Sequence, residues 1–288
     1  MKDLGIKWQG RRGSDNIEDR RARGGARRAG GVGGVGAIVL LLAGWYFGVD
    51  VSGFVGDGGG AVGSSQQSQI TPEDERAAEF VSVTLADTEE VWTDVFRQQV
   101  GKPYDPPILV LFKGSTQSAC GGASAATGPF YCPPENKAFL DTEFFTTMER
   151  QMGAGGDFAA AYVVAHEIAH HVQDELGILG QANQIRSQVD KVQSNGISVR
   201  IELQADCFSG IWAKSVQAKF GSLERGDIAE AMNSAKQIGD DTLQRNAGQR
   251  VQPHTFTHGT SEQRQRWFAR GFESGNLGDC DTFSASQL

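Results

Sequence analysis

One short motif in this chain has the residue types and the spacing to hold and use a metal ion. Residues 166–170 read HEIAH, an HExxH pattern in a chain with only five histidines. Residues four apart share one face of a helix, so His166 and His170 can bind one zinc ion with Glu167 beside them. Zinc lowers the pKa of bound water from about 15.7 to about 7, and a neighbouring carboxylate can then take its proton. The motif predicts hydrolysis without a covalent intermediate.

The residues around the motif indicate a buried helix rather than a chance pattern on a solvated surface. Apolar residues recur at three-to-four spacing from Asp157, the predicted N-cap, to Leu176, and Gly177 ends the helix. A buried histidine or glutamate needs a partner, and a metal ion provides one. A catalytic zinc has three protein ligands and one open position, so a third ligand must come from elsewhere in the chain.

A second acidic motif, ELQAD at 202–206, offers this third ligand. On a predicted helix over 198–219, Glu202 and Asp206 share a face. Glu202 can then bind zinc while Asp206 accepts a hydrogen bond from a ligand histidine. The alternative is a solvated acidic pair, which is disfavoured by the apolar neighbours Leu203, Ala205, Cys207 and Phe208. Glu175 is a poorer ligand because, five residues beyond His170, it turns off the metal-binding face.

Both motifs and long stretches around them resemble a known family. The pair HEIAHHV and ELQAD is similar to the glutamate-ligand zincins such as thermolysin, and more closely to the bacterial putative neutral zinc metallopeptidases. The resemblance covers roughly residues 101–283 and includes KPYDPPILVLFKGSTQSACGGASAATGPFYCP, FLDTEFF, GDFAAAYVVAHEIAHHVQ, SVRIELQADCFSGIWA, FTHGTSEQRQRWFARGF and CDTF. It implies that His166, His170 and Glu202 are zinc ligands and that Glu167 is the general acid and base. It also implies that Asp206 supports a ligand histidine without binding the metal itself.

The resemblance also implies a zincin-like α+β fold, mainly helical, in which a small sheet lies over the active-site helix and its edge strand holds an extended peptide. The apolar run at 108–112 and the shorter stretch at 137–140 are the predicted strands. Beyond those given above, helices are predicted over 71–100, 227–238 and 261–272, of which the first is capped by Thr71 and the last opens with a Thr260–Gln263 capping box.

The sequence gives weaker evidence for a role of the remaining histidines. His254 and His258 fall in a loop before Thr260, where a histidine could donate to the developing oxyanion as zincins require. His258 is the better candidate because it belongs to a resembling stretch, and a plain surface loop is an equally open interpretation. His171 lies about 100° round the helix from His170, so we expect it to be packed or hydrogen-bonded outside the site.

The N-terminal residues predict a membrane anchor. Residues 1–28 carry nine Lys/Arg and four Asp/Glu, a net charge of +5, which leaves −13 for the rest of a chain whose net charge is −8. Residues 30–49 are twenty residues without a charge, long enough to cross about 30 Å of hydrocarbon as a helix. A cleaved signal peptide is the alternative, disfavoured because no small-x-small site follows Trp45. Nucleic-acid binding is disfavoured because the basic segment adjoins an apolar run.

The predicted organisation therefore has four parts. They are a basic cytoplasmic tail at 1–29, a single transmembrane helix at 30–49, a flexible Gly/Ser/Gln linker at 50–70 and a zinc metallopeptidase domain at 71–288. The basic flank predicts a cytoplasmic N-terminus, which places the catalytic domain outside the inner membrane, in the extracytoplasmic or periplasmic space.

Four cysteines in such a compartment favour two disulfides. Three pairings are possible. We predict Cys120 with Cys132, which would staple a stretch rich in glycine, serine and alanine, and Cys207 with Cys280, which would tie the ligand helix to the C-terminus. A cysteine metal site is disfavoured because the chain has no CxxC spacing.

The expected function is that of a membrane-anchored zinc metallopeptidase acting on a peptide or protein substrate. A different class stays open: a catalytically inactive, membrane-tethered binding or scaffolding protein that keeps a zincin-like fold. Hydrolysis of a nonpeptide amide is a third possibility, since zinc polarises any carbonyl.

Overall fold

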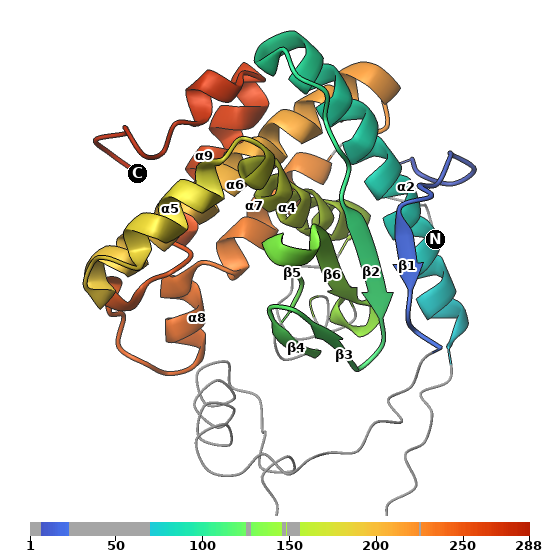
Figure 1. Cartoon of the computed structure of the whole chain (residues 1–288). Coiled ribbons are helices and arrows are strands. Elements are labelled where there is room, and N and C mark those ends of the chain that lie inside the picture. Colours follow the sequence, from blue (N-terminus) through green and yellow to red (C-terminus); the bar gives the residue numbers. More distant parts are fainter. Residues whose placement is uncertain (1–6, 23–69, 125–127, 146–147, 149–155, 225) are drawn as a thin grey trace, which may run out of the picture.

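The computed structural model describes residues 7–22, 70–124, 128–145, 148, 156–224 and 226–288. Within these ranges the protein is mainly helical, with a four-stranded sheet and a separate two-stranded hairpin on one side of the helices (Figure 1). The α+β class predicted from the sequence is confirmed.

The four-stranded sheet has the order β1-β2-β6-β5. Its strands are β1 (Ile17–Asp19), β2 (Ile108–Phe112), β6 (Lys137–Asp141) and β5 (Phe130–Cys132). β1 and β6 are parallel to β2, whereas β5 is antiparallel to β6 and forms an edge. The two central strands are the predicted ones, and their nearly unbroken burial fits strands covered on both faces. β3 (Ser115–Ser118) and β4 (Gly121–Ser124) form the hairpin.

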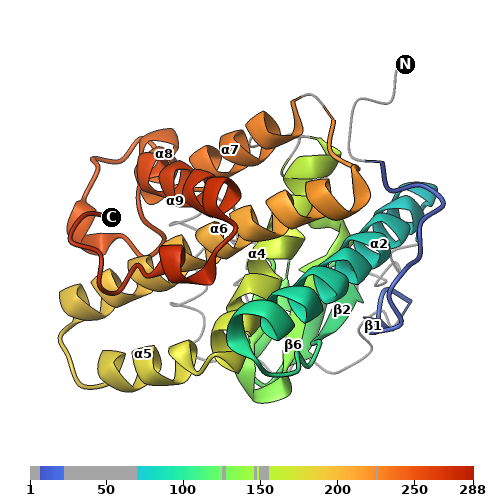
Figure 2. The ribbon, with the colours of Figure 1, turned by 90° about the horizontal axis from the view of Figure 1, so that it is seen from above.

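The helices surround a long central helix, α6. They are α2 (Pro72–Val95), α4 (Asp157–Glu175), α5 (Ile178–Arg186), α6 (Lys191–Phe220), α7 (Asp227–Gln237), α8 (Asp240–Asn246) and α9 (Ser261–Ser274). A short π-helical segment, Phe96–Val100, continues α2, and 3₁₀ turns lie at Pro133–Glu135, Pro253–Thr255 and Leu277–Cys280. α6 packs against α2, α4, α5 and α9, and Figure 2 shows α9 lying along it. The sheet lies against α4 through β5 and β6.

Capping side chains set several of the helix boundaries. Thr71 opens α2 with a capping box closed by Asp74, and Thr260 opens α9 with a capping box closed by Gln263. α4 begins one residue earlier than predicted, because Gly156 is its N-cap and Asp157 is already in the first turn. Leu176 then ends α4 before Gly177, whose φ of 74° lies in the left-handed region that glycine adopts without strain.

Two glycines let α6 and α9 approach until their backbones touch. A Cβ on Gly271 would overlap the carbonyl group of Cys207, and a Cβ on Gly210 would overlap the carbonyl oxygen of Phe268. Any larger residue at either position would push the helices apart. This contact matters for the candidate site because α6 carries its acidic residues and α9 carries a partner for one of them.

The N-terminal segment is folded against the same body as α4. Trp8 donates from Nε1 to Asp157 Oδ2 at 3.0 Å, and Arg11 binds both oxygens of Asp87 on α2, at 2.7 and 2.5 Å. β1 adds a parallel strand to β2. Residues 7–22 therefore belong to the folded domain and do not form the separate tail that the sequence predicted.

This arrangement corrects the predicted localisation. None of the helices in the described ranges is both long and apolar enough to cross a membrane. Residues 7–22 pack on the domain formed by residues 70–288, so a bilayer cannot separate the two as a cytoplasmic N-terminus and an extracytoplasmic domain would require. The single-pass inner-membrane prediction is wrong. The membrane prediction took account only of the length of the uncharged run. Seven of the twenty residues in that run are glycines, which have no apolar side chain. The predicted span at 30–49 and the predicted linker at 50–70, apart from residue 70, lie outside the described residues.

Asp74 joins the start of α2 to the sheet through a buried ionic network. Its carboxylate accepts hydrogen bonds from Lys113 Nζ at 2.6 Å, from Thr142 Oγ1 at 2.9 Å and from the Thr71 backbone N–H at 2.8 Å. Burial raises the pKa of Asp74, but these donors outweigh it and lower the pKa to about 2. The charged form is thus favoured in the folded state, and the interaction stabilises the fold wherever Asp74 is ionised.

Asp74→Asn should lower the free energy of unfolding at pH 7 by about 2 to 3 kcal/mol, from a folded pKa near 2 and an unfolded pKa near 3.9. A lowered folded pKa stabilises above the unfolded pKa, so the difference from wild type should shrink as the pH falls from about 4 towards 2. Urea denaturation at several pH values measures it. Glu262→Gln, at a side chain that is 83% exposed, is the control and should change stability by less than about 0.5 kcal/mol. A pH-independent difference would rule out the charge of Asp74 as the cause.

Candidate metal centre

The structure brings the two histidines of the HExxH motif together with Glu202. α4 presents His166 and His170 one turn apart, with ring centroids 4.8 Å from each other, and α6 places Glu202 against both. His166 Nε2 lies 3.1 Å from Glu202 Oε2, and His170 Nε2 lies 3.6 Å from Glu202 Oε1. One ligand atom from each of the three residues lies within 4.8 Å of the others.

This donor set fits a zinc ion. Ligands about 2.0 to 2.1 Å from a tetrahedral zinc are about 3.3 Å from one another, and the two contacts of Glu202 fall on either side of that value. Two neutral imidazoles and one carboxylate are ligands that zinc accepts, and three protein ligands leave a fourth position open. The arrangement can therefore hold a metal ion with access for a further ligand.

The charges of the cluster favour an ionised Glu202. Burial raises the pKa of Glu202, but the positive charge of His170 and the hydrogen bond from His166, with a contribution from His258, lower it well below its usual value. Burial also lowers the pKa of His166, whereas Asp206 and Glu202 raise it to about 9. A metal ion bound through His166 must displace a proton, so binding releases protons over the neutral range.

Glu167 projects beside this cluster and is half-buried. Burial raises the pKa of its carboxyl group, the charges of His170 and His166 oppose the shift, and the charge of Glu202 adds to it. A carboxylate with a raised pKa is a better proton acceptor and can return the proton later. Its position and its pKa suit proton transfer next to the three candidate ligands.

Asp206 is fully buried behind His166 and is held by three side chains. His166 Nδ1 lies 3.0 Å from Asp206 Oδ1. Tyr162 donates to Oδ1 at 2.5 Å, and Arg264 forms a bidentate pair through Nε at 2.8 Å and an Nη at 2.9 Å. Burial raises the pKa of Asp206, but Arg264 and His166 outweigh it and lower the pKa. The carboxylate is thus charged and faces the ring of a candidate ligand.

Sequence reasoning did not single out Arg264 or Tyr162. Arg264 on α9 is 1% exposed although arginine is seldom buried without a partner. A signal was present: Arg264 stands three, four and seven residues before Trp267, Phe268 and Gly271, on the buried face of an amphipathic helix. Tyr162 precedes His166 by one turn and so shares the face of the metal motif. A charge within an apolar stripe indicates a buried partner, and here that partner is Asp206.

His258 lies in a loop that Asp240 fastens in place. Asp240 Oδ2 accepts the backbone N–H groups of Thr257, His258 and Gly259, at 2.8, 2.6 and 3.0 Å. His258 Nδ1 lies 3.3 Å from Asp240 Oδ1, and its side chain is 40% exposed. Burial lowers the pKa of His258, but Asp240 and Glu202 raise it. A Cβ on Gly259 would meet Leu203 on α6, which shows how closely this loop approaches the segment next to Glu202.

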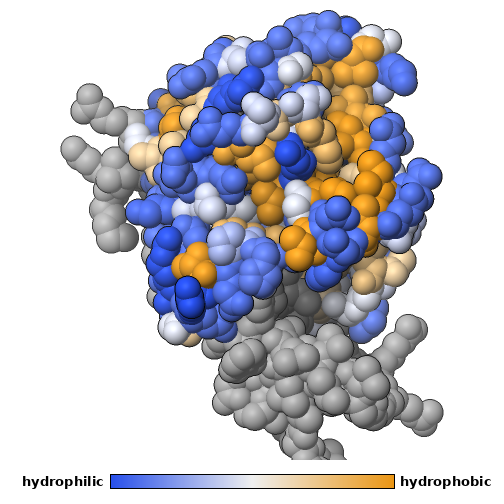
Figure 3. Space-filling view, turned by 90° about the vertical axis from the view of Figure 1, so that its left-hand side faces the viewer, coloured by the Kyte–Doolittle hydropathy of each residue, from blue (hydrophilic) through white to orange (hydrophobic). Residues whose placement is uncertain are grey.

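An apolar hollow of about 660 Å³ adjoins the same loop. It is lined by residues of α6 and α8, by the loop before α9 and by the C-terminal residue, among them Val199, Phe256, Thr260 and Leu288. Figure 3 shows this side of the molecule, where apolar side chains gather among hydrophilic ones. The hollow offers surface for an apolar side chain beside the loop that leads into α9.

The other histidines lie outside the cluster. His171 is 1% exposed, donates from Nε2 to the carbonyl oxygen of Asp105 at 2.7 Å and contacts Tyr131, which agrees with the expected packed position. His254 is exposed in the 3₁₀ turn Pro253–Thr255. Glu175 is exposed at the end of α4, away from the ligand atoms.

Both disulfides join the cysteines that the sequence pairs. Cys120 and Cys132 link the hairpin to β5, next to the sheet edge. Cys207 and Cys280 link α6, one residue beyond Asp206, to the turn that follows α9. The second disulfide thus ties the helix of the acidic motif to the C-terminal segment.

The fold and the His-His-Glu cluster together define a helical α+β protein with a candidate zinc site of the HExxH type. The chain belongs to the family described as putative neutral zinc metallopeptidases, which its sequence matches over residues 6–283. The predicted family is thereby confirmed, and it extends to the N-terminal segment.

Two similar proteins come from two bacterial species. Uncharacterized protein YpfJ of Escherichia coli strain K12 is 46% identical over 291 residues, which cover 98% of this chain and all of that protein. An uncharacterized protein of Mycobacterium tuberculosis strain H37Rv is 44% identical over 195 residues, or 64% of this chain and 65% of the relative. No solved structure matches the chain significantly.

Arg264→Met should lower the free energy of unfolding by about 3 to 5 kcal/mol, because it leaves the buried charge of Asp206 without its main partner. The double variant Arg264→Met with Asp206→Asn should be more stable than the single one, since it removes that charge as well. Chemical denaturation of both proteins measures the two effects. Arg266→Met, on the exposed side of α9, is the control and should cost less than about 1 kcal/mol. A double variant less stable than Arg264→Met would contradict this reading of the pair.

Proposed function

We propose that this protein is a zinc-dependent peptidase with a zincin-like arrangement, which hydrolyses peptide bonds with water. The observation that carries the proposal is the convergence of His166, His170 and Glu202 from two helices, with Glu167 beside them. Membership of a family of putative zinc metallopeptidases supports zinc as the metal and peptides as the substrate class.

In this proposal His166 and His170 bind zinc through Nε2, and Glu202 binds it through a carboxylate oxygen. When bound, zinc supplies a Lewis acid that polarises the scissile carbonyl and lowers the pKa of water. Asp206 orients the His166 ring from its Nδ1 side. Carboxylates in this position commonly fix the tautomer and orientation of a ligand histidine.

Glu167 is the proposed general base and acid. Its carboxylate takes a proton from the attacking water and later gives that proton to the leaving amine. Burial favours the proton-bearing form of Glu167, so the group can hold the proton between the two steps. No covalent bond between the enzyme and the substrate is required.

His258 is the proposed donor to the oxyanion that forms from the scissile carbonyl. Asp240 faces Nδ1 and stabilises a proton there, so the ring donates to the substrate from Nε2 when it carries a second proton on that atom. The raised pKa of His258 increases the fraction of the ring that can donate from Nε2. The backbone bonds to Asp240 keep the loop in place before substrate binds.

The edge strand β5 is the proposed binding place for an extended peptide. β5 packs against α4, the helix of the HExxH motif, and pairs on one side with β6. A peptide that adds to a sheet edge gains main-chain hydrogen bonds whatever its side chains, which suits a protease. The apolar hollow next to the His258 loop would receive a side chain of the substrate.

Glu167→Gln should keep zinc and lose hydrolysis, because glutamine cannot accept the proton. We expect kcat on casein or on a fluorogenic peptide library to fall by about 10²- to 10⁴-fold. Zinc content is measured by metal analysis of the same preparation. Glu175→Gln is the matched control: the same substitution at an exposed site on the same helix should leave both quantities unchanged.

The same experiment separates the proposal from a binding protein without turnover. Stoichiometric zinc in wild type, with no cleavage of any peptide in the library, would show that the cluster binds metal but that the enzymatic proposal is wrong. If Glu167→Gln cleaves as fast as wild type, the role given to Glu167 is wrong.

His258→Gln should lower kcat by about 10²- to 10³-fold, the usual loss for one oxyanion donor, and leave zinc affinity unchanged. His254→Gln, in the same loop region but exposed, should leave kcat within a factor of about two of wild type. Steady-state kinetics with one peptide substrate measure both variants. Equal losses in the two variants would assign the effect to the loop and not to His258.

A further inference from the structure

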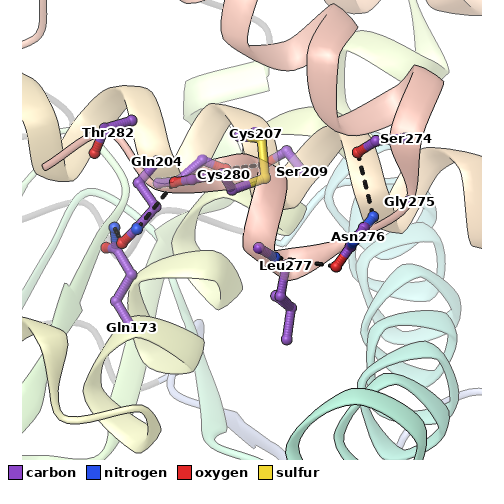
Figure 4. Close-up of a disulfide and its surroundings, with 12 residues drawn as sticks. Gln173, Gln204, Cys207, Ser209, Ser274, Gly275, Asn276, Leu277, Cys280 and Thr282 are labelled. Atoms are coloured by element: carbon purple, nitrogen blue, oxygen red, sulfur yellow. Dashed lines mark hydrogen bonds between the residues drawn. A yellow bond between two sulfur atoms is a disulfide. The ribbon is translucent and has the colours of Figure 1, made fainter. Parts of the chain in front are cut away.

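A chain of glutamine side chains leads from the Cys207–Cys280 disulfide to the candidate ligand His170. Gln204 on α6 donates from Nε2 to the carbonyl oxygen of Cys280 at 3.1 Å. Gln173 on α4 donates from Nε2 to Gln204 Oε1 at 3.0 Å. Figure 4 shows the two amides pointing toward one another, with Cys280 beyond Gln204. Both glutamines are buried, at 0% and 5% exposure for Gln173 and Gln204.

The carbonyl group of Cys280, at one end of this series of hydrogen bonds, fixes which atom donates and which accepts in each of them. The carbonyl oxygen of Cys280 can only accept, so Gln204 must turn its Nε2 toward it and its Oε1 toward Gln173. Gln173 must then turn its Nε2 toward Gln204, and the same nitrogen also donates to the carbonyl oxygen of Ile201 at 2.8 Å. Gln173 Oε1 is left for His170, whose Nδ1 lies 2.9 Å away.

An amide oxygen can only accept, so His170 must carry its proton on Nδ1. The lone pair is then on Nε2, the atom that faces Glu202 at 3.6 Å. A ligand histidine needs this tautomer to bind a metal ion through Nε2. The opposite tautomer would place a proton where the metal belongs.

We propose that Gln173 and Gln204 are positioning residues, a directional hydrogen-bond relay that presets His170 for metal binding and is anchored by the Cys207–Cys280 disulfide. The inference rests on the proposed function only in naming the metal as zinc. His166 is oriented by a carboxylate, Asp206, whereas His170 is oriented by a neutral amide. The relay therefore adds no further carboxylate to a site that already holds Glu202, Glu167 and Asp206.

The disulfide gives the relay a fixed end. It joins Cys280 to α6 three residues after Gln204, so the turn that carries the acceptor carbonyl is tethered to the helix that carries the donor amide. Thr282 strengthens this end, since its Oγ1 donates to the carbonyl oxygen of Arg200 at 2.7 Å. Without the disulfide the 3₁₀ turn at Leu277–Cys280 would be tethered less closely, and Gln204 would lose its fixed acceptor.

The test uses two measurements on the full chain. Chelator competition gives the zinc affinity, and NMR of histidine-labelled protein gives the exchange rate of the His170 Nδ1 proton. Gln173→Leu should raise the Kd for zinc by roughly 10- to 100-fold, which is the usual effect of removing a hydrogen-bond partner of a metal ligand. It should also speed exchange of that proton. Gln204→Leu should act in the same direction but less. The matched control is Gln181→Leu, at an exposed glutamine on α5, which should change neither quantity.

A double-variant cycle distinguishes a relay from separate packing effects. Gln204→Leu should have no further effect on zinc affinity in the Gln173→Leu background, because its influence passes through Gln173. Replacing Cys207 and Cys280 together by serine should weaken zinc binding in the wild-type background and not in Gln173→Leu. Replacing Cys120 and Cys132 by serine, which removes the other disulfide, should leave zinc affinity unchanged.

Additive losses in the cycle, or a Gln173→Leu protein that binds zinc as tightly as Gln181→Leu, would overturn the relay. If Gln173→Leu fails to fold by circular dichroism, Gln204→Leu and the cysteine variants decide in its place, and unchanged zinc affinity in all of them overturns it. If wild type binds no zinc, the proposed function fails, and proton exchange at His170 in the metal-free protein still tests the relay. If zinc binding follows the relay but no peptide is cleaved, the peptidase proposal fails and the relay stands.

Discussion

A carboxylate with no exposed surface, Asp206, sets the constraint on which the arrangement of the site depends. A buried charge is tolerated only with a well-placed counter-charge and enough hydrogen bonds. Asp206 on α6 finds them in Arg264 on α9 and Tyr162 on α4, and it also lies against His166. Three helices must keep one relative position to satisfy this charge. The same position brings Glu202, one turn earlier on α6, to the two histidines of α4.

The packing around α6 supports that position from two further directions. Gly210 and Gly271 allow α6 and α9 to touch, which is what carries Arg264 within reach of Asp206. The disulfide from Cys207 closes the segment that follows α9 onto the same helix. Elements that stabilise the fold thus also position the candidate ligands. A loss of packing between α6 and α9 should therefore disturb the positions of the candidate ligands.

Elements with strong local signals were predictable, and those formed by distant contacts were not. The helix over 157–175 and the capping box at Thr260 follow from apolar spacing and from side chains that bond their own backbone. β1 has no such signal: three residues in a charged segment become a strand only by pairing with β2, much later in the chain. The membrane prediction failed for a related reason, because the segment before the apolar run folds back onto the domain that follows it.

The sequence by itself determined that His166 and His170 share a helix face, that Glu202 and Asp206 share another, and that the chain belongs to the family described as putative neutral zinc metallopeptidases. These conclusions rest on helical periodicity and on motifs, which are local in the chain. Only the tertiary structure decided that Arg264 neutralises Asp206 and that Gln173 faces His170 with its oxygen. Arg264 comes from α9, and the groups that orient Gln173 come from α6 and from the turn at Cys280. The orientation of each amide is set by which neighbouring groups can only donate or only accept. That information exists only once the helices are packed.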